Sequence, residues 1–185
     1  MLVAVARGTR VEAWAAEKGP AYACPNCHLE VILRKGQLVT HHFAHKPPVT
    51  CSWGKGETEA HRKAKKVLHD AMTARGLRAG VECEVLSTEG DRRADVLVWG
   101  RKGESRVAFE VQHQPLDYNT IERRTRAYAA TGVRVCGRPI RSEAVGEVGA
   151  RLRHGRLVVH RPGGRPSLAW GAERAPHRGS VFLLA

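Results

Sequence analysis

The sequence has no apolar segment long enough to cross a bilayer, because its apolar stretches have the length of strands and are interrupted by charged residues. Residues 1–7 lack the basic start and the length of a signal peptide. A basic amphipathic helix with aromatic anchors, which is typical of proteins that lie on a membrane surface, is also missing. We therefore expect a cytoplasmic protein without membrane insertion. The sequence indicates no particular protein partner.

Acidic residues are scarce relative to basic ones. The chain has 31 Lys and Arg against 18 Asp and Glu, which gives a formal net charge of +13. Such an excess favours a polyanionic partner, most often nucleic acid. The length of 185 residues suits one domain, or a compact domain with a small additional module, and no internal repeat divides the chain.

The chain has only five cysteines, too few for a disulfide-rich scaffold, and in a reducing compartment clustered cysteines indicate metal binding. Cys24 and Cys27 form a Cys-x-x-Cys knuckle, which supplies two thiolates to a tetrahedral zinc ion. His45 and Cys51 bracket a proline-containing loop that can fold back onto the knuckle. We predict that these two complete the four ligands, with His42 as the substitute.

A closed site with four protein ligands has no open coordination position. We therefore expect the zinc ion to stabilise a small zinc-ribbon-like segment and not to take part in catalysis. The alternative is a redox-active dithiol at Cys24 and Cys27, but this needs a thioredoxin-like context that the sequence lacks.

A hairpin is predicted from residues 92–99 and 106–114, two runs rich in β-branched and apolar residues that flank a glycine-rich turn. If the turn closes symmetrically, Trp99 pairs with Arg106. The same register places Asp95 directly opposite Glu110.

Two carboxylates that face each other across a ladder repel, and a divalent cation would reverse this penalty. Glu110 and Gln112 share one face, because side chains alternate along a strand. Asp95, Glu110 and Gln112 therefore resemble a site for a hard cation such as Mg²⁺. The alternative is a solvated hairpin face that carries two ordinary acids.

A helix is predicted over residues 57–75 and is ended by Gly76. Helical spacing places Glu57, His61 and Lys65 on one stripe at the border of the apolar face, where a site could form. The alternative is a solvated helix end with an acidic residue in its first turn.

The remaining predicted elements are a strand at 81–86, a helix at 117–131 with Arg124 directed inward, and a strand at 133–136. With the hairpin they give the order helix, three strands, helix, strand. This order implies an α/β fold, an α+β arrangement with a mixed sheet and helices on its faces.

The order and its polar residues resemble the PD-(D/E)XK nuclease fold and, more specifically, the competence protein CoiA family. The resemblance covers roughly residues 20–136 and rests on six motifs: Cys24-Pro25-x-Cys27, His42-Phe43-Ala44-His45, Glu57-Thr58-x-x-His61-x-x-x-Lys65, Arg92-Arg93-Ala94-Asp95-Val96, Glu110-Val111-Gln112 and Arg124-Thr125-x-x-Tyr128. Several motifs in the right order are more specific than any single one.

The resemblance implies a restriction-endonuclease-like αβββαβ core behind an N-terminal zinc-ribbon-like segment. Asp95 and Glu110 would hold Mg²⁺ or Mn²⁺, and Gln112 would occupy the place of the fold's usual lysine. Glu57 and His61 would complete the site. The family is expected to act on DNA during natural transformation, with single strands as one candidate substrate.

The chain departs from the family pattern at two positions. Gln114 stands where the family tends to have a serine, and Cys136-Gly137 replaces an expected tryptophan. Both positions follow the ligand motifs and leave the ligands intact, so they bear on substrate handling more than on chemistry.

These residues suggest hydrolysis of DNA phosphodiester bonds by a metal-dependent deoxyribonuclease. Gln112 has no useful pKa and can only orient water. The base is therefore either His61 or a water whose pKa the cation lowers. Lys65 and Arg124 would neutralise charge on the phosphoryl oxygens.

Two other functions fit parts of the pattern. A catalytically inactive nuclease-like module that binds DNA or docks a partner would tolerate glutamine in the lysine position. A zinc-ribbon transcription factor would not require Asp95 and Glu110 at all.

We expect three regions: an N-terminal hairpin and zinc-ribbon-like region at 1–55, the nuclease-like core at 56–140, and a basic extension rich in Gly, Pro and Arg at 141–185. Within the extension, 150–162 suggests a basic hairpin and 181–184 a final strand. The extension would either add phosphate contacts or form a solvated tail.

Overall fold

The computed structural model describes residues 1–101, 103, 105–112, 117–139, 149–153 and 156–160. The chain divides into two compact units, Met1–Lys66 and Val67–Ala185, and each is described by itself. Gln114 and the predicted strand at 181–184 lie outside the described residues. The three predicted regions at 1–55, 56–140 and 141–185 remain predictions. None of the described helices is both long and apolar enough to span a membrane.

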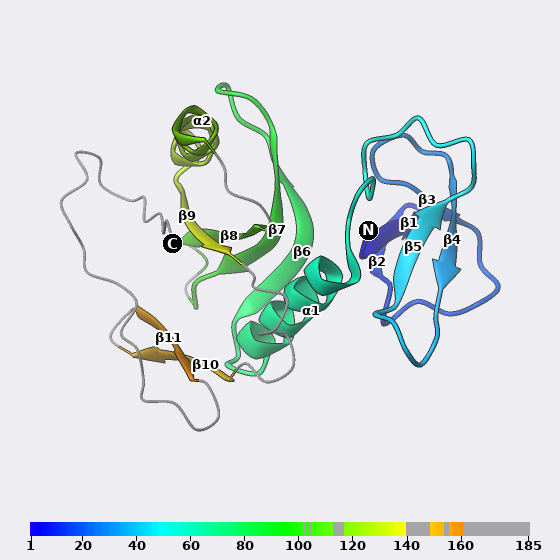
Figure 1. Ribbon diagram of the computed structural model, residues 1–185, viewed down its shortest axis with the longest axis horizontal. Coiled ribbons are helices and arrows are strands. Elements are labelled where there is room, and N and C mark those ends of the chain that lie inside the picture. Colours follow the sequence, from blue (N-terminus) through cyan, green and yellow to red (C-terminus); the bar gives the residue numbers. More distant parts are fainter. Residues whose placement is uncertain (102, 104, 113–116, 140–148, 154–155, 161–185) are drawn as a thin grey trace. The chain divides into compact units, whose positions relative to one another are not determined.

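The N-terminal unit contains one antiparallel sheet with the strand order β2-β1-β3-β4-β5 (Figure 1). Its strands are β1 (Val3–Ala6), β2 (Thr9–Glu12), β3 (Tyr22–Ala23), β4 (Glu30–Arg34) and β5 (His42–His45). The first two form a hairpin, as predicted. Its turn, Arg7-Gly8, has positive φ at both residues, which matches the right-handed twist of the strands.

Part of the core of this unit is formed by Tyr22 of β3 and Phe43 of β5, which are both buried and whose rings are 4.9 Å apart. Leu2 and Val3 at the start of the chain are fully buried.

Helix α1 (Glu59–Thr73) begins two residues later than predicted. The Thr58 hydroxyl accepts a hydrogen bond from the His61 backbone N–H at 3.2 Å, so Thr58 caps the helix. Gly76, with φ of 71°, ends it. The prediction that Glu57 lies on a helical stripe is therefore wrong, because Glu57 precedes the cap.

The C-terminal unit contains a mixed sheet with the order β6-β7-β8-β9. Its strands are β6 (Arg78–Val85), β7 (Arg92–Trp99), β8 (Arg106–Gln112) and β9 (Val133–Pro139). The pairs β6–β7 and β7–β8 are antiparallel, and β9 runs parallel to β8. From α1 to β9 the elements follow the predicted αβββαβ order, and the fold is of the mixed α+β class.

Helix α2 (Tyr118–Ala129) connects β8 to β9 and packs on this sheet beside β9 (Figure 1). The Asp117 side chain caps the helix by accepting the Thr120 N–H at 2.9 Å. A cluster of seven buried residues joins helix and sheet: Val85, Ala94, Leu97, Ala108, Tyr128, Val133 and Val135. The cluster fixes the face of α2 that is directed at the sheet.

Beyond the mixed sheet, β10 (Gly149–Arg153) and β11 (Arg156–His160) pair antiparallel. This confirms the hairpin expected near 150–162.

Candidate functional site

The hairpin of β7 and β8 has the predicted register. Trp99 pairs with Arg106, and the ladder continues to Val96 and Phe109. The next position on each strand places Asp95 opposite Glu110. There the backbone ladder ends, and Asp95 Oδ2 instead accepts the Val111 N–H at 2.8 Å.

Beyond this point the two strands keep different partners. The last residues of β8, from Glu110 to Gln112, pair with β9, whereas the first residues of β7, from Arg92 to Ala94, pair with β6. We call this divergence of β7 and β8 the fork. The two acidic residues therefore lie at the point where β7 and β8 stop pairing with each other.

Two side chains of α2 contact the Glu110 carboxylate. The Tyr128 hydroxyl donates a hydrogen bond of 2.5 Å to Oε1. Arg124 Nη1 lies 3.6 Å from Oε2, in agreement with the predicted inward direction of this arginine. The two residues are four positions apart and so share one stripe of the helix.

The environment of Glu110 disfavours its charged form. Burial, followed by the negative charge of Asp95, raises the pKa of Glu110 to about 7, although Tyr128, Arg124 and Arg92 act in the opposite direction. Burial and the charge of Glu110 also raise the pKa of Tyr128, which therefore stays a hydrogen-bond donor. The nearby arginines do not fully offset the burial of Glu110 and the charge of Asp95. Two such carboxylates are a suitable oxygen donor set for a hard divalent cation.

Gln112 and Arg92 lie on the two branches of the fork. Gln112 is two residues beyond Glu110 on β8 and is partly buried. Arg92 starts β7, and its Nε atom is buried with no hydrogen-bond partner in the part of the chain that the structure describes. Sequence reasoning did not assign Arg92 to the site.

A second cluster lies in the N-terminal unit. The ligand atoms of Cys24, Cys27, His45 and Cys51 are all within 4.8 Å of one another. The Cys24 and Cys51 sulfurs are 3.9 Å apart, and Cys27 Sγ lies 3.3 Å from His45 Nε2. Sulfurs bound to one tetrahedral zinc ion at about 2.3 Å would be roughly 3.8 Å apart, so the cluster fits such an ion.

Local structure brings these four residues together. The knuckle between β3 and β4 is closed by hydrogen bonds from Cys24 N to Leu29 O and from His28 N to Cys24 O. His45 ends β5, whereas the substitute candidate His42 is outside the cluster and has Nδ1 2.9 Å from the Thr40 carbonyl.

The thiols differ in their surroundings. Burial raises the pKa of Cys24 to about 11. For Cys51 burial also opposes ionisation, but N–H groups of Asn26 and Trp53, each 3.4 Å from Sγ, outweigh it and lower the pKa of this thiol. N–H donors to a thiolate are typical of the groups around a bound metal. The cluster could hold a metal such as zinc.

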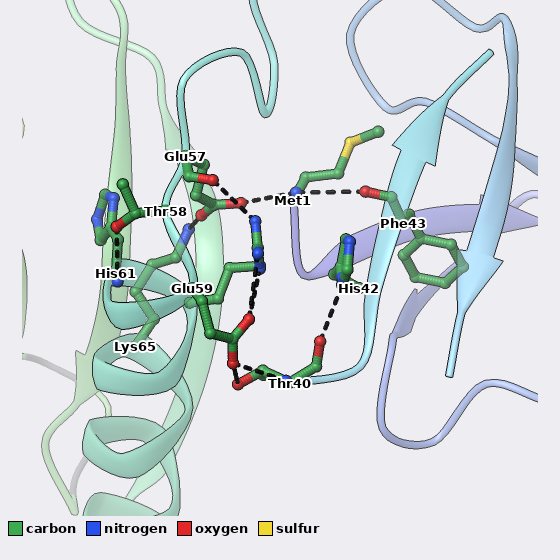
Figure 2. Close-up of polar contacts among 10 residues, drawn as sticks. Met1, Thr40, His42, Phe43, Glu57, Thr58, Glu59, His61 and Lys65 are labelled. Atoms are coloured by element: carbon green, nitrogen blue, oxygen red, sulfur yellow. Dashed lines mark hydrogen bonds and ion pairs between the residues drawn. The ribbon is translucent and has the colours of Figure 1, made fainter. Parts of the chain in front are cut away.

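Glu57 and Lys65 form an ion pair in the N-terminal unit, and the α-amino group of Met1 lies 2.7 Å from the other Glu57 oxygen (Figure 2). Lys65 is almost completely buried. Burial opposes the charge on Glu57, but these two cations lower the pKa of Glu57 to about 2. The imidazole of His61 points away from this carboxylate. A role of Glu57, His61 and Lys65 in the chemistry of Asp95 and Glu110 remains a prediction.

Glu59 connects α1 to the segment that precedes β5. Its Oε1 accepts hydrogen bonds from the Thr40 N–H and hydroxyl, at 2.7 and 2.6 Å. Its Oε2 accepts from Arg62, whose guanidinium also donates to the Glu57 carbonyl. These contacts, also drawn in Figure 2, were not apparent from the sequence.

Comparison with known proteins gave two matches to family models. Residues 6–54 match the N-terminal domain of competence protein CoiA, and residues 57–136 match the nuclease-like domain of the same protein. The chain belongs to the competence protein CoiA family. No curated protein and no solved structure matches it.

In this CoiA-family chain the two matched segments divide the candidate residues. The N-terminal match contains the cysteine and histidine cluster, and the nuclease-like match contains Asp95, Glu110, Gln112 and Arg124. The nuclease-like domain supports a nuclease-related role.

Tyr128 belongs to one of the sequence motifs, but the sequence alone did not assign it to the site. Its spacing of four residues from Arg124 on the inward stripe of α2 was the signal that could have identified it.

Proposed function

We propose that the protein is a metal-dependent deoxyribonuclease, with Asp95 and Glu110 as ligands of Mg²⁺ or Mn²⁺. The observation that carries this proposal is the position of the two carboxylates at the fork, where their mutual repulsion contributes to the raised pKa of Glu110. A divalent cation would remove this repulsion and favour both charged forms.

The side chains around the two acids have distinct roles in this proposal. The cation would polarise the scissile phosphate and lower the pKa of the attacking water. Gln112 would orient the water, since an amide cannot act as a base. Arg124, which already contacts Glu110, and Arg92, whose buried Nε atom has no acceptor in the described part of the chain, would neutralise charge on the phosphoryl oxygens.

The substrate would be DNA, single-stranded or duplex, in transformation or another DNA-processing event. The net charge of +13 supports a polyanionic substrate. His61 stays the predicted alternative base. Lys65 would have to leave its ion pair with Glu57 before it could contact a phosphate.

The test is cleavage of labelled single-stranded and duplex DNA by the purified, zinc-loaded protein with and without Mg²⁺ or Mn²⁺. Asp95→Ala and Glu110→Ala should each reduce cleavage at least about 100-fold, since even groups around the ligands are worth about 10–100-fold in affinity or activity. Glu122→Ala is the matched control, because Glu122 lies on the outer side of α2, where it pairs with Arg126. Undiminished cleavage by Asp95→Ala would refute the assignment.

A second function is favoured by one observation, the glutamine at position 112 where the fold's usual lysine would stand. Here the protein would be a catalytically inactive nuclease-like module that binds DNA or docks a partner. It would bind DNA equally well with or without Asp95 and Glu110, and would not cleave it.

A further inference from the structure

Tyr128 is the largest of the fully buried side chains in the described part of the chain, and its residue is 1% exposed. It belongs to the buried hydrophobic cluster that joins α2 to the sheet, together with residues such as Leu97, Ala108 and Val133. Because protein cores are close-packed, this ring has one position, and the hydroxyl has one place to reach.

The hydroxyl reaches a carboxylate. A buried tyrosine needs a hydrogen-bond partner, and a backbone carbonyl would serve that need equally well. Here the partner is Glu110 Oε1, at 2.5 Å, while Arg124 Nη1 lies nearest Oε2. Both oxygens of this carboxylate are therefore held by side chains from one stripe of α2.

We propose that Tyr128 is a positioning residue that holds the Glu110 carboxylate beside Asp95 in one orientation and thereby strengthens binding of a divalent cation by the pair. This inference rests on the proposed function, since it assumes that Glu110 is a ligand. It goes beyond that function by assigning part of the cation affinity to a residue that does not touch the cation.

Two effects of the hydroxyl oppose each other. As a donor it withdraws negative charge from Oε1, which weakens a ligand. As a fixed partner it removes the freedom of a side chain with three rotatable bonds, which favours binding. Removal of partners around metal ligands generally weakens binding by about 10–100-fold, so we expect the orienting effect to be the larger one.

The experiment titrates Mn²⁺ into the zinc-loaded full-length chain by calorimetry, with Asp95→Ala as the reference for ions bound elsewhere. Tyr128→Phe keeps the packed ring and removes only the hydroxyl, and it should bind Mn²⁺ about 10–100-fold more weakly. Tyr118→Phe makes the same chemical change on the same helix at a residue that is 73% exposed, and it should bind like the wild type.

Unchanged or tighter binding by Tyr128→Phe would overturn the inference, while Asp95-dependent binding by the wild type would leave the proposed function intact. If the wild type binds no more Mn²⁺ than Asp95→Ala, the proposed function itself fails, and the inference with it.

A second measurement needs no variant at position 128. In protein labelled with 3-fluorotyrosine, the ¹⁹F resonance of Tyr128 should shift when Mg²⁺ is added, and that of Tyr118 should not. A Tyr128 resonance that is insensitive to a saturating cation would contradict the proposed contact with a metal ligand.

Discussion

Replacement of Asp95 by Asn should stabilise the protein while it abolishes cation binding. The amide oxygen of Asn can still accept the Val111 N–H that Asp95 Oδ2 accepts at 2.8 Å, so the end of the β7–β8 ladder is preserved. What disappears is the negative charge beside Glu110. Glu110 and Asp95 repel each other only when Glu110 is ionised. The stabilisation of the protein by Asp95→Asn should therefore depend on pH.

The magnitude follows from the pKa of Glu110, which burial and Asp95 raise from 4.5 to about 7. A raised pKa means that the folded state holds the proton more tightly than the unfolded state. The folded state is therefore favoured most below pH 4.5, and it loses this advantage as the pH rises through about 7.

One pKa unit corresponds to about 1.4 kcal/mol, so the full shift lowers the free energy of unfolding by about 3 kcal/mol at high pH. Burial is the larger cause of this shift, and Asp95 is the second. Cross-strand pairs contribute roughly 0.2–1 kcal/mol, and like charges directly opposite each other are destabilising, so removal of the Asp95 charge should gain up to about 1 kcal/mol, which for a chain of this size raises Tm by up to about 2–4 °C.

The assay is thermal unfolding of the zinc-loaded protein without added Mg²⁺ or Mn²⁺, at about pH 8 and about pH 5. Asp95→Asn should raise Tm at the higher pH and leave it nearly unchanged at the lower one, where Glu110 is protonated. Asp117→Asn is the matched control, because Asn caps a helix as well as Asp does and Asp117 lies outside the fork. An equal change in Tm at both pH values, or destabilisation at the higher one, would refute the reasoning.

Three further predictions follow from the same structure. The rise in the Tm of the wild type on addition of Mg²⁺ should become smaller as the pH falls below about 7, since the cation must displace the proton on Glu110. A rise in Tm that stays constant down to about pH 5 would contradict this. Cys27→Ala should leave less than one equivalent of zinc per chain by elemental analysis, and a full equivalent would exclude Cys27 as a ligand. Glu59→Gln should lower the free energy of unfolding by roughly 1–2 kcal/mol because it weakens the charged acceptor for Thr40, whereas the exposed Glu30→Gln should change it by less than about 1 kcal/mol.

The hairpin at the centre of the site could be predicted because its information is local. The loop between Trp99 and Arg106 is short, so symmetrical closure defines every pair along the ladder. The cysteine and histidine cluster was accessible for a similar reason. The knuckle is a four-residue motif, and His45 and Cys51 are only six residues apart, so both could return to it through one loop.

The partners of the acidic residues could not be predicted, because they depend on packing between distant segments. The contact from Tyr128 to Glu110 requires that α2 docks with one particular stripe on the sheet, and helical spacing defines the stripe but not what it faces. The predicted start of α1 was wrong because the sequence reasoning placed Glu57 in the first turn. Thr58 instead caps the helix, since its hydroxyl accepts the His61 N–H, and Glu57 lies before the cap.

The fork gives the chain a way to change its site without altering either acid. Asp95 belongs to the half of the sheet formed by β6 and β7, whereas Glu110 is held by β9 and α2, and the Val111 N–H to Asp95 hydrogen bond is the last link between the two halves. Substitutions on α2 or β9 can therefore adjust the separation of the carboxylates by small steps. Under the proposed function, such substitutions would tune which cation the pair prefers while both acids stay unchanged.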